Sequence, residues 1–184
     1  METWSSKKTV IPSEGVIWVR VPAGPPYYLI PYFRRNNMTN IEYNKQLIEK
    51  YPFLYPRNAW TGEPIQDYDY SYTELDKFPT GWHIAFGEQM CAELMEALGD
   101  NIKDFRIIQI KEKFGFLHFY TNWTTVKVDK VINKYERLSR KTCINCGAPA
   151  TRVSTGWICP WCDDCASLID DKTIPIEEFY DEEE

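Results

Sequence analysis

The chain has 184 residues, of which 43% are hydrophobic and 15% aromatic, and this excludes a disordered tail and predicts one core with a small appendage. The net charge of −6 hides a division: residues 103–153 carry eleven Lys and Arg against four Asp and Glu, and the other residues carry ten against twenty-three. One basic surface on an acidic molecule is expected. No run approaches the roughly 20 apolar residues of a membrane span, and no secretion signal is visible, so a cytoplasmic protein with no membrane partner is predicted.

The amino-terminal part predicts a β-hairpin and then a short helix. Two β-runs, 16–21 and 27–33, flank a Gly-Pro-Pro turn, and Pro31 indicates that the second run is an edge strand. A helix is predicted over 40–51, stopped before Pro52.

The next stretch, up to residue 82, interleaves prolines with many aromatic residues. This predicts a long ordered segment that is clamped by ring packing. Two readings of the rings between Tyr51 and Tyr72 are open. They form part of the core, which we favour, or they stack on nucleic-acid bases.

Two helices and a hairpin complete the predicted body. Helices are expected over 82–98, with Gly99 as the stop, and over 126–140. Residues 105–111 and 116–120 predict the hairpin, with Gly115 near its turn. The apolar face of the first helix comprises Trp82, Ala85, Phe86, Met90, Leu94 and Leu98, and that of the second comprises Val128, Val131, Ile132, Tyr135 and Leu138.

Five of the six cysteines crowd into residues 143–165, whereas Cys91 lies alone in a helical pattern. This arrangement suits thiolates on a metal in a reducing compartment better than a disulfide framework. The motif Cys143-x2-Cys146 followed by Gly147 is typical of a zinc knuckle, in which backbone amides point at the thiolates.

A tetrahedral site needs one more pair, which is either Cys159 with Cys162 or Cys162 with Cys165. We favour the second pairing, because Ala166 then supplies the small residue that follows a knuckle, a place that Asp163 would fill in the other pairing. Cys159 ends an apolar run, where a buried thiol is ordinary. The predicted ligands are Cys143, Cys146, Cys162 and Cys165.

Four thiolates predict one structural zinc ion per chain, because they leave no coordination position for a catalytic water. His83 and His118 are the only histidines, and neither lies in a deaminase-type motif, so both are expected to be structural. The Cys-Pro-Trp-Cys motif is similar to that of glutaredoxins, but the chain has no room beyond it for the remaining thioredoxin-like fold. No catalytic residues are predicted.

Basic residues recur at spacings of three and four along the helix predicted over 126–140. At about 100° per residue they form one stripe, to which Arg106, Lys111 and Lys113 of the hairpin could add. The stripe is either a phosphate-binding surface for nucleic acid or a nucleotide, or only a solvated face, and we favour the solvated face. The basic stripe comprises Lys127, Lys130, Lys134, Arg137 and Lys141.

Two tryptophans, Trp157 and Trp161, flank the cysteines and are expected to pack the ribbon, although an exposed Trp161 would suit a partner interface. The acidic carboxyl end is expected to be a frayed, solubilising tail or, alternatively, a mimic of phosphates. The predicted fold class is α+β, a small mixed body with hairpins, two main helices and a carboxyl-terminal zinc-ribbon-like module. The predicted divisions are 1–39 (hairpin extension), 40–140 (body), 141–168 (zinc ribbon) and 169–184 (acidic tail).

Several motifs together resemble a family of uncharacterised bacteriophage and prophage proteins: "YPFLYPRNAWTGE", "YDYSYTELDKFPTGWHIAFGEQMC", "IIQIKEKFGFLHFYTN" and "INKYERLSRKTCINCGAPATRVSTGWICPWCDDCA". The likeness spans residues 40–166. It implies expression inside a bacterial cell and the zinc pairs Cys143/Cys146 and Cys162/Cys165, with Cys159 outside the pattern. We therefore expect a non-enzymatic protein that binds a host protein of defence or transcription, or alternatively nucleic acid or a nucleotide signal through the basic stripe.

Overall fold

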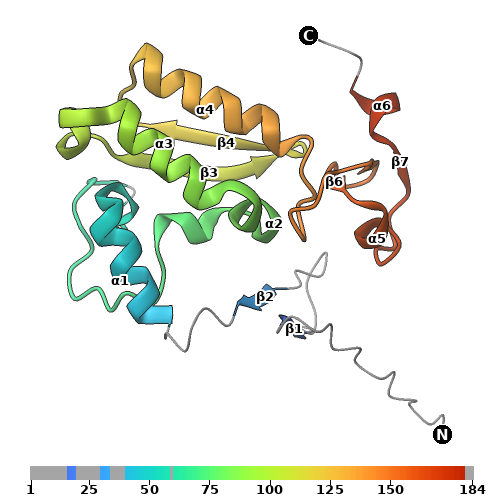
Figure 1. Cartoon of the computed structure of the whole chain (residues 1–184), viewed down its shortest axis with the longest axis horizontal. Coiled ribbons are helices and arrows are strands. Elements are labelled where there is room, and N and C mark those ends of the chain that lie inside the picture. Colours follow the sequence, from blue (N-terminus) through green and yellow to red (C-terminus); the bar gives the residue numbers. More distant parts are fainter. Residues whose placement is uncertain (1–15, 20–29, 34–39, 59, 181–184) are drawn as a thin grey trace, which may run out of the picture.

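The structure, a computed structural model, describes residues 16–19, 30–33, 40–58 and 60–180 (Figure 1). Helices and small antiparallel sheets make an α+β fold, as predicted, and its carboxyl end is a zinc-ribbon-like module with four clustered cysteines. In the described part of the chain, no helix has the length and apolar composition of a membrane span.

The amino-terminal hairpin consists of β1 (Val16–Val19) and β2 (Ile30–Phe33), which pair antiparallel. Pro31 is opposite Trp18 in a sheet of only two strands, so the predicted edge position of the proline is confirmed. The described strands lie within the predicted runs, 16–21 and 27–33. The Gly-Pro-Pro turn and the remaining residues of both runs lie outside the described residues.

Helix α1 (Asn40–Lys50) ends before the proline that opens the short 3₁₀ turn η1 (Pro52–Leu54), as predicted. The segment that follows is ordered by its own rings. The ring of Tyr68 lies 4.8–5.6 Å, centroid to centroid, from three others, those of Tyr55, Tyr70 and Tyr72.

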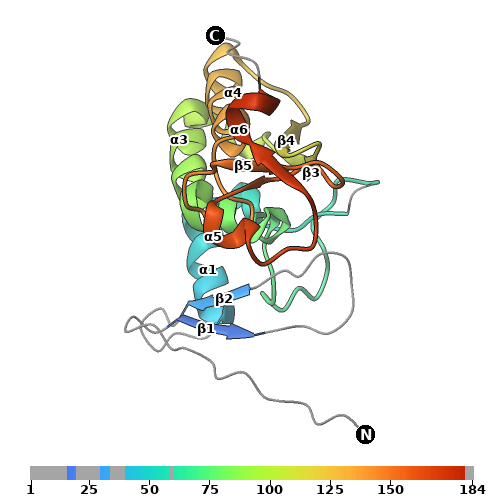
Figure 2. The ribbon, with the colours of Figure 1, turned by 90° about the vertical axis from the view of Figure 1, so that its right-hand side faces the viewer.

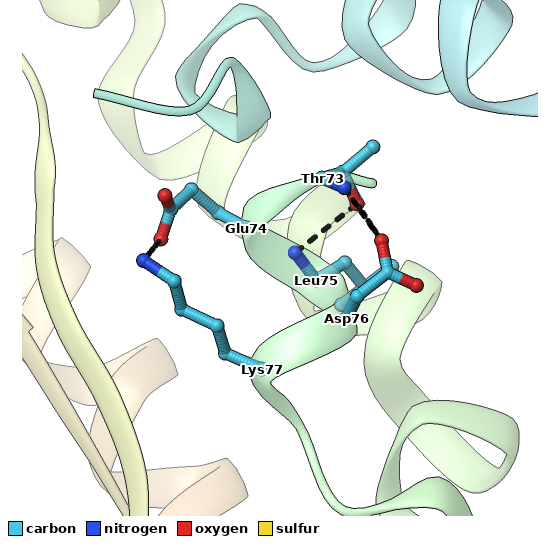
Figure 3. A network of polar contacts seen from close by, with 5 residues as sticks. All are labelled: Thr73, Glu74, Leu75, Asp76 and Lys77. Carbon is cyan, nitrogen blue, oxygen red and sulfur yellow. Dashed lines mark hydrogen bonds and ion pairs between the residues drawn. The ribbon is translucent and has the colours of Figure 1, made fainter. Parts of the chain in front are cut away.

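A second 3₁₀ turn, η2 (Glu74–Lys77), anchors the end of this aromatic segment (Figure 3). The Thr73 hydroxyl accepts from the backbone N–H of Leu75 at 3.2 Å, and a carboxylate oxygen of Asp76 accepts from the N–H of Thr73 at 2.5 Å. Burial raises the pKa of the Glu74 carboxyl, and the Lys77 ammonium at 2.5 Å acts in the opposite direction. The reciprocal cap and the ion pair fix the chain where it enters the main helix.

The main helix begins at Thr80, two residues earlier than predicted, and runs through three segments to Gly99. At Gly99 the backbone adopts a φ of 52° and ends the helix as predicted. Its predicted apolar face is buried, with the exception of Ala85, which is exposed. The segments are α2 (Thr80–Trp82), the π-helical η3 (His83–Gly87) and α3 (Glu88–Leu98), and the 3₁₀ turn η4 (Gly99–Lys103) follows.

Strands β3 (Ile107–Lys113) and β4 (Phe116–Thr121) form the predicted hairpin. Its two turn residues, Phe114 and Gly115, both have positive φ angles, 53° and 82°. This is the backbone of a type I′ turn, whose twist matches that of the strands. The hairpin therefore begins and ends within two residues of the prediction.

Helix α4 (Val126–Ser139) packs against α3 and β4 (Figures 1 and 2). Val128, Ile132 and Tyr135 are buried as predicted. The prediction for Leu138 was wrong: its side chain is 39% exposed, and the buried residue of this turn is Ser139. The Ser139 hydroxyl accepts the N–H of Leu117 at 2.8 Å, so a polar residue is buried because it satisfies the free edge of β4.

The carboxyl-terminal module is a three-stranded antiparallel sheet, in the order β6-β5-β7, with two short helices. The tail predicted from residue 169 begins too early, because β7 pairs with β5 and α6 follows it directly. Residues 181–184, its most acidic part, lie outside the described residues. The elements are β5 (Arg152–Ser154), β6 (Pro160–Trp161), α5 (Asp163–Ala166), β7 (Thr173–Pro175) and α6 (Ile176–Phe179).

Nearly all buried apolar side chains of the described residues form one cluster that runs from the body into the module. Trp82, Leu94 and Leu117 of the body belong to the same cluster as Ile144 and Trp161 of the module. The cysteine module is therefore packed onto the body through shared core.

Candidate metal centre

The first cysteine turn, residues 143–147, has the backbone of a zinc knuckle. The N–H of Cys143 donates to the carbonyl of Ala148 at 2.7 Å, and the N–H of Gly147 donates to the carbonyl of Cys143 at 3.0 Å. Gly147 adopts a φ of 81°, which a residue with a Cβ rarely does. The glycine that the sequence pattern singled out is thus required by the turn.

The second cysteine turn lies at the start of α5. Cys162 is the N-cap of this helix, and its sulfur lies 3.5 Å from the backbone N–H of Cys165. Ala166 follows at a half-buried position. The N–H of Ile144 donates to the carbonyl of Pro160 at 2.9 Å, and this bond joins the first turn to the strand that leads into the second.

These two turns bring together four sulfurs, all within 4.8 Å of one another: those of Cys143, Cys146, Cys162 and Cys165. A tetrahedron of sulfurs with zinc–sulfur bonds of about 2.3 Å has edges of about 3.8 Å, so the cluster has the size of a metal site. The sulfurs of Cys146 and Cys162 lie 3.5 Å apart. The geometry suits a metal ion, and the set is the one predicted.

Hydrogen bonds to the sulfurs stabilise negative charge in the cluster. A bond from the Cys165 thiol lowers the pKa of Cys143 to about 4, and the backbone N–H groups of Cys146, Cys162 and Asn145 act in the same direction. Burial raises the pKa of Cys146 to about 11, and the pKa of Cys165 is raised because its proton is held between two sulfurs. The Asn145 side chain donates to the Cys165 sulfur at 3.3 Å. A bound cation would replace these shared protons.

The remaining cysteines lie outside the cluster and are poor nucleophiles. Cys159 is buried, its backbone N–H donates to the Ser154 hydroxyl at 3.1 Å, and burial raises its pKa to about 12. Burial also raises the pKa of Cys91 on α3 to about 12. Since a thiolate is the reactive form, neither thiol is activated for catalysis.

The first knuckle is docked directly on the start of the main helix. The N–H of Gly81 donates to the carbonyl of Ile144 at 2.8 Å, and a Cβ on Gly81 would lie 2.1 Å from the carbonyl oxygen of Cys143. The Trp82 indole N–H donates to the carbonyl of Thr142 at 3.0 Å. Sequence reasoning had no means to find this contact, because Gly81 and Thr142 are far apart in the chain.

All five residues of the predicted basic stripe are exposed, four of them on α4 and Lys141 just after its end. Lys134 is tied to α3, because its ammonium lies 2.6 Å from the Glu93 carboxylate, which also accepts from the Tyr135 hydroxyl at 2.8 Å. Lys111 and Lys113 lie on the outer face of the hairpin, on the side away from the core. What the stripe binds stays a prediction.

Trp161 packs inside the ribbon, as expected, and so does not offer a partner contact, whereas the same expectation for Trp157 was wrong. Trp161 is 6% exposed, and its indole N–H donates to the Ser154 hydroxyl at 3.0 Å. Trp157 is the exposed tryptophan of the module, at 65%. The Asp171 carboxylate accepts the backbone N–H groups of Gly156 and Trp157 at 3.1–3.2 Å and holds this turn.

In the aromatic segment, Tyr51 and Phe53 are buried in the core, as favoured from the sequence. Trp60 is an exception at 96% exposed. It lies in a turn closed by the bridge between Arg57 and Pro64. Of the two histidines predicted to be structural, His118 lies on the outer face of the hairpin, beside the rings of Phe116 and Tyr120.

Comparison with known proteins finds no matching family model, no matching curated protein and no matching solved structure.

Proposed function

We propose that this protein is a zinc-stabilised binding protein that acts on a host protein in the bacterial cytoplasm, and that it is not an enzyme. The observation that carries the proposal is the cluster of four cysteine sulfurs within 4.8 Å of one another. The cysteines come from two turns, and in each turn the two cysteines are three positions apart in the sequence. Four thiolates prefer zinc and close its coordination sphere, so the ion holds the fold and activates no water. The likeness to bacteriophage proteins supports a bacterial host.

The exposed indole of Trp157 favours a protein partner. It protrudes from the module on a turn that Asp171 holds through two hydrogen bonds. A large aromatic side chain on a preorganised turn gives up little conformational entropy on binding, and tryptophan is enriched among the residues that dominate interface energies. We therefore assign the partner contact to this turn.

Metal analysis tests the zinc assignment. The purified chain is expected to hold about one zinc ion. Cys165→Ser removes a ligand and is expected to lose the zinc, whereas Cys159→Ser is a matched change of a buried cysteine outside the cluster and is expected to keep it. Zinc lost by Cys159→Ser and kept by Cys165→Ser would overturn the ligand assignment.

Affinity capture from bacterial host lysate, with and without nuclease, tests the binding role. A host protein that is retained after nuclease treatment and lost with Trp157→Ala would support the proposal. Trp60→Ala is the control, because it removes an even more exposed indole, 96% against 65%, from a different loop. Equal capture by wild type and by Trp157→Ala would refute the assignment of the partner contact.

A further inference from the structure

The β3–β4 hairpin presents a face that the core does not cover. Leu117 and Phe119 point to the inner face and are buried, and α3 and α4 lie on that side (Figure 2). Side chains alternate between the two faces of a strand, so the intervening residues of β4 point outward. Tyr120, one of these, is 45% exposed.

The outward residues of β4 are three rings in a row: Phe116, His118 and Tyr120. The rings of His118 and Tyr120 are parallel within 7°, with centroids 6.1 Å apart. Phe116 is already engaged, because the Arg140 guanidinium lies 4.3 Å from its ring centroid. His118 is partly buried, with its centroid 4.2 Å from that of Phe116 and its Nε2 atom shielded from solvent, so the open ring of the row is Tyr120.

The residues opposite these rings on β3 are cationic or polar. The register pairs Lys113 with Phe116, Lys111 with His118, and Gln109 with Tyr120. The Lys111 ammonium lies 5.1 Å from the centroid of the Tyr120 ring. Each ring thus has an amine or an amide beside it on the same face.

Neither β3 nor β4 contributes a carboxylate to this face. The one acidic residue of the two strands, Glu112, is opposite Leu117 and so belongs to the inner face, where it accepts the N–H of Gly115 at 2.7 Å. The two lysines are therefore not neutralised on their own surface. They lie within the basic part of an otherwise acidic chain.

We propose that this face binds single-stranded nucleic acid, with a base stacked on Tyr120 and phosphates held by Lys111 and Lys113. Exposed aromatic rings beside cations are the combination that single-strand binders use, because every base has a face to stack and every nucleotide carries a negative charge. Lysine is depleted in the centre of protein interfaces, so the two lysines favour a phosphate ligand over a protein. This proposal is independent of the host-protein contact at Trp157.

Fluorescence anisotropy with labelled 12-nucleotide oligo(dT) and oligo(U), and with a duplex of the same length, tests the proposal on the full chain. Binding of at least one single strand is expected, tighter than that of the duplex, and weaker at 200 mM than at 50 mM salt. Preference for oligo(dT) or oligo(U) identifies DNA or RNA as the ligand. No binding of either single strand at 50 mM salt would overturn the proposal.

Substitutions locate the site. Tyr120→Ala is expected to raise the dissociation constant about tenfold or more, and Tyr120→Phe, which keeps the ring, is expected to bind as the wild type does. Lys111→Glu with Lys113→Glu is expected to abolish binding. The control reverses the same charge on α4, Lys130→Glu with Arg137→Glu, and is expected to retain binding.

The result that overturns the site assignment is loss of binding in the α4 control with retention in the hairpin variants. Equal effects of Tyr120→Ala and Tyr120→Phe would exclude stacking. Each variant is first checked for its zinc content and circular dichroism, so that loss of the fold is not taken for loss of the site. A host protein captured through Tyr120 in the absence of any oligonucleotide binding would also refute the proposal.

Discussion

The two cysteine turns have the same spacing but very different surroundings. In the first, Cys143, Ile144 and Asn145 are all buried, and the turn contacts the main helix through Gly81. In the second, the two residues between the cysteines are exposed, and the turn opens a helix of only four residues. The first turn is therefore held in shape by the body, whereas the second would depend more on a bound metal ion.

This difference predicts that the two halves of the metal site differ in stability. A turn clamped by a buried tryptophan and a close backbone contact keeps its shape when the metal leaves. A short helix with exposed sides cannot be stable alone, since helix nucleation is unfavourable. Four predictions test this contrast, from the largest expected effect to the smallest.

Removal of the metal is expected to have the largest effect. After treatment with a chelator, amide exchange over residues 162–168 should accelerate about 100-fold or more, and exchange over 143–147 by less than about tenfold. Hydrogen exchange measured by mass spectrometry gives both values in one experiment. Return of protection on addition of zinc is the control. Equal acceleration of amide exchange in the two turns would contradict the predicted difference in their stability.

Gly81→Ala should be the most damaging single substitution at the interface between the body and the first turn. The new Cβ would lie 2.1 Å from the Cys143 carbonyl oxygen, a backbone atom that cannot move alone. We expect a loss of about 3 kcal/mol or more in the free energy of unfolding, measured by denaturant titration with zinc present. Gly99→Ala is the control: no atom lies within 4 Å of its new Cβ, so only backbone strain at a φ of 52° and a ψ of −127° opposes it, at a cost of about 1–3 kcal/mol.

Trp82→Phe should destabilise the fold by about 2 kcal/mol, because it leaves the buried carbonyl of Thr142 without its indole donor. Trp161→Phe is a matched change in the module. It should cost less, since the Ser154 hydroxyl keeps the N–H of Cys159 as a partner. Thermal unfolding ranks the two variants by stability. A larger loss of stability in Trp161→Phe than in Trp82→Phe would mean that the second cysteine turn, and not the first, is the more constrained.

Asp163→Asn should have the smallest effect, within about 0.5 kcal/mol. The Asp163 carboxylate lies 3.7 Å from the Arg152 guanidinium and is largely exposed, so solvent screens the pair. Denaturant titration at low and high salt measures this contribution. A loss above about 1 kcal/mol would mean that surface charge, and not only the metal, holds the second turn.

Much of this structure could be predicted from local patterns. The turn at Gly115, the helix end at Gly99 and the extent of α4 follow from conformational preferences and apolar spacing within a few residues. The grouping of Cys162 with Cys165, and not with Cys159, could also be predicted from the small residue that follows each knuckle. These features depend on neighbours along the chain.

The errors all involve residues whose partners are distant in sequence. Leu138 is exposed and Ser139 buried because the edge of β4 needs a hydrogen-bond acceptor at that point. The strand over Thr173–Pro175 was read as part of a tail because its pairing partner, β5, lies about twenty residues earlier. No periodicity within these segments reports such contacts.

The sequence alone thus determined which cysteines come together and which segments form the helices and the hairpins of the body, because spacing and turn chemistry act over a few residues. Only the tertiary structure decided which tryptophan is exposed, where the knuckle docks and which hairpin face remains open. Those outcomes depend on the packing of Gly81 against residue 143 and of α4 along β4, contacts between segments that the linear pattern does not relate.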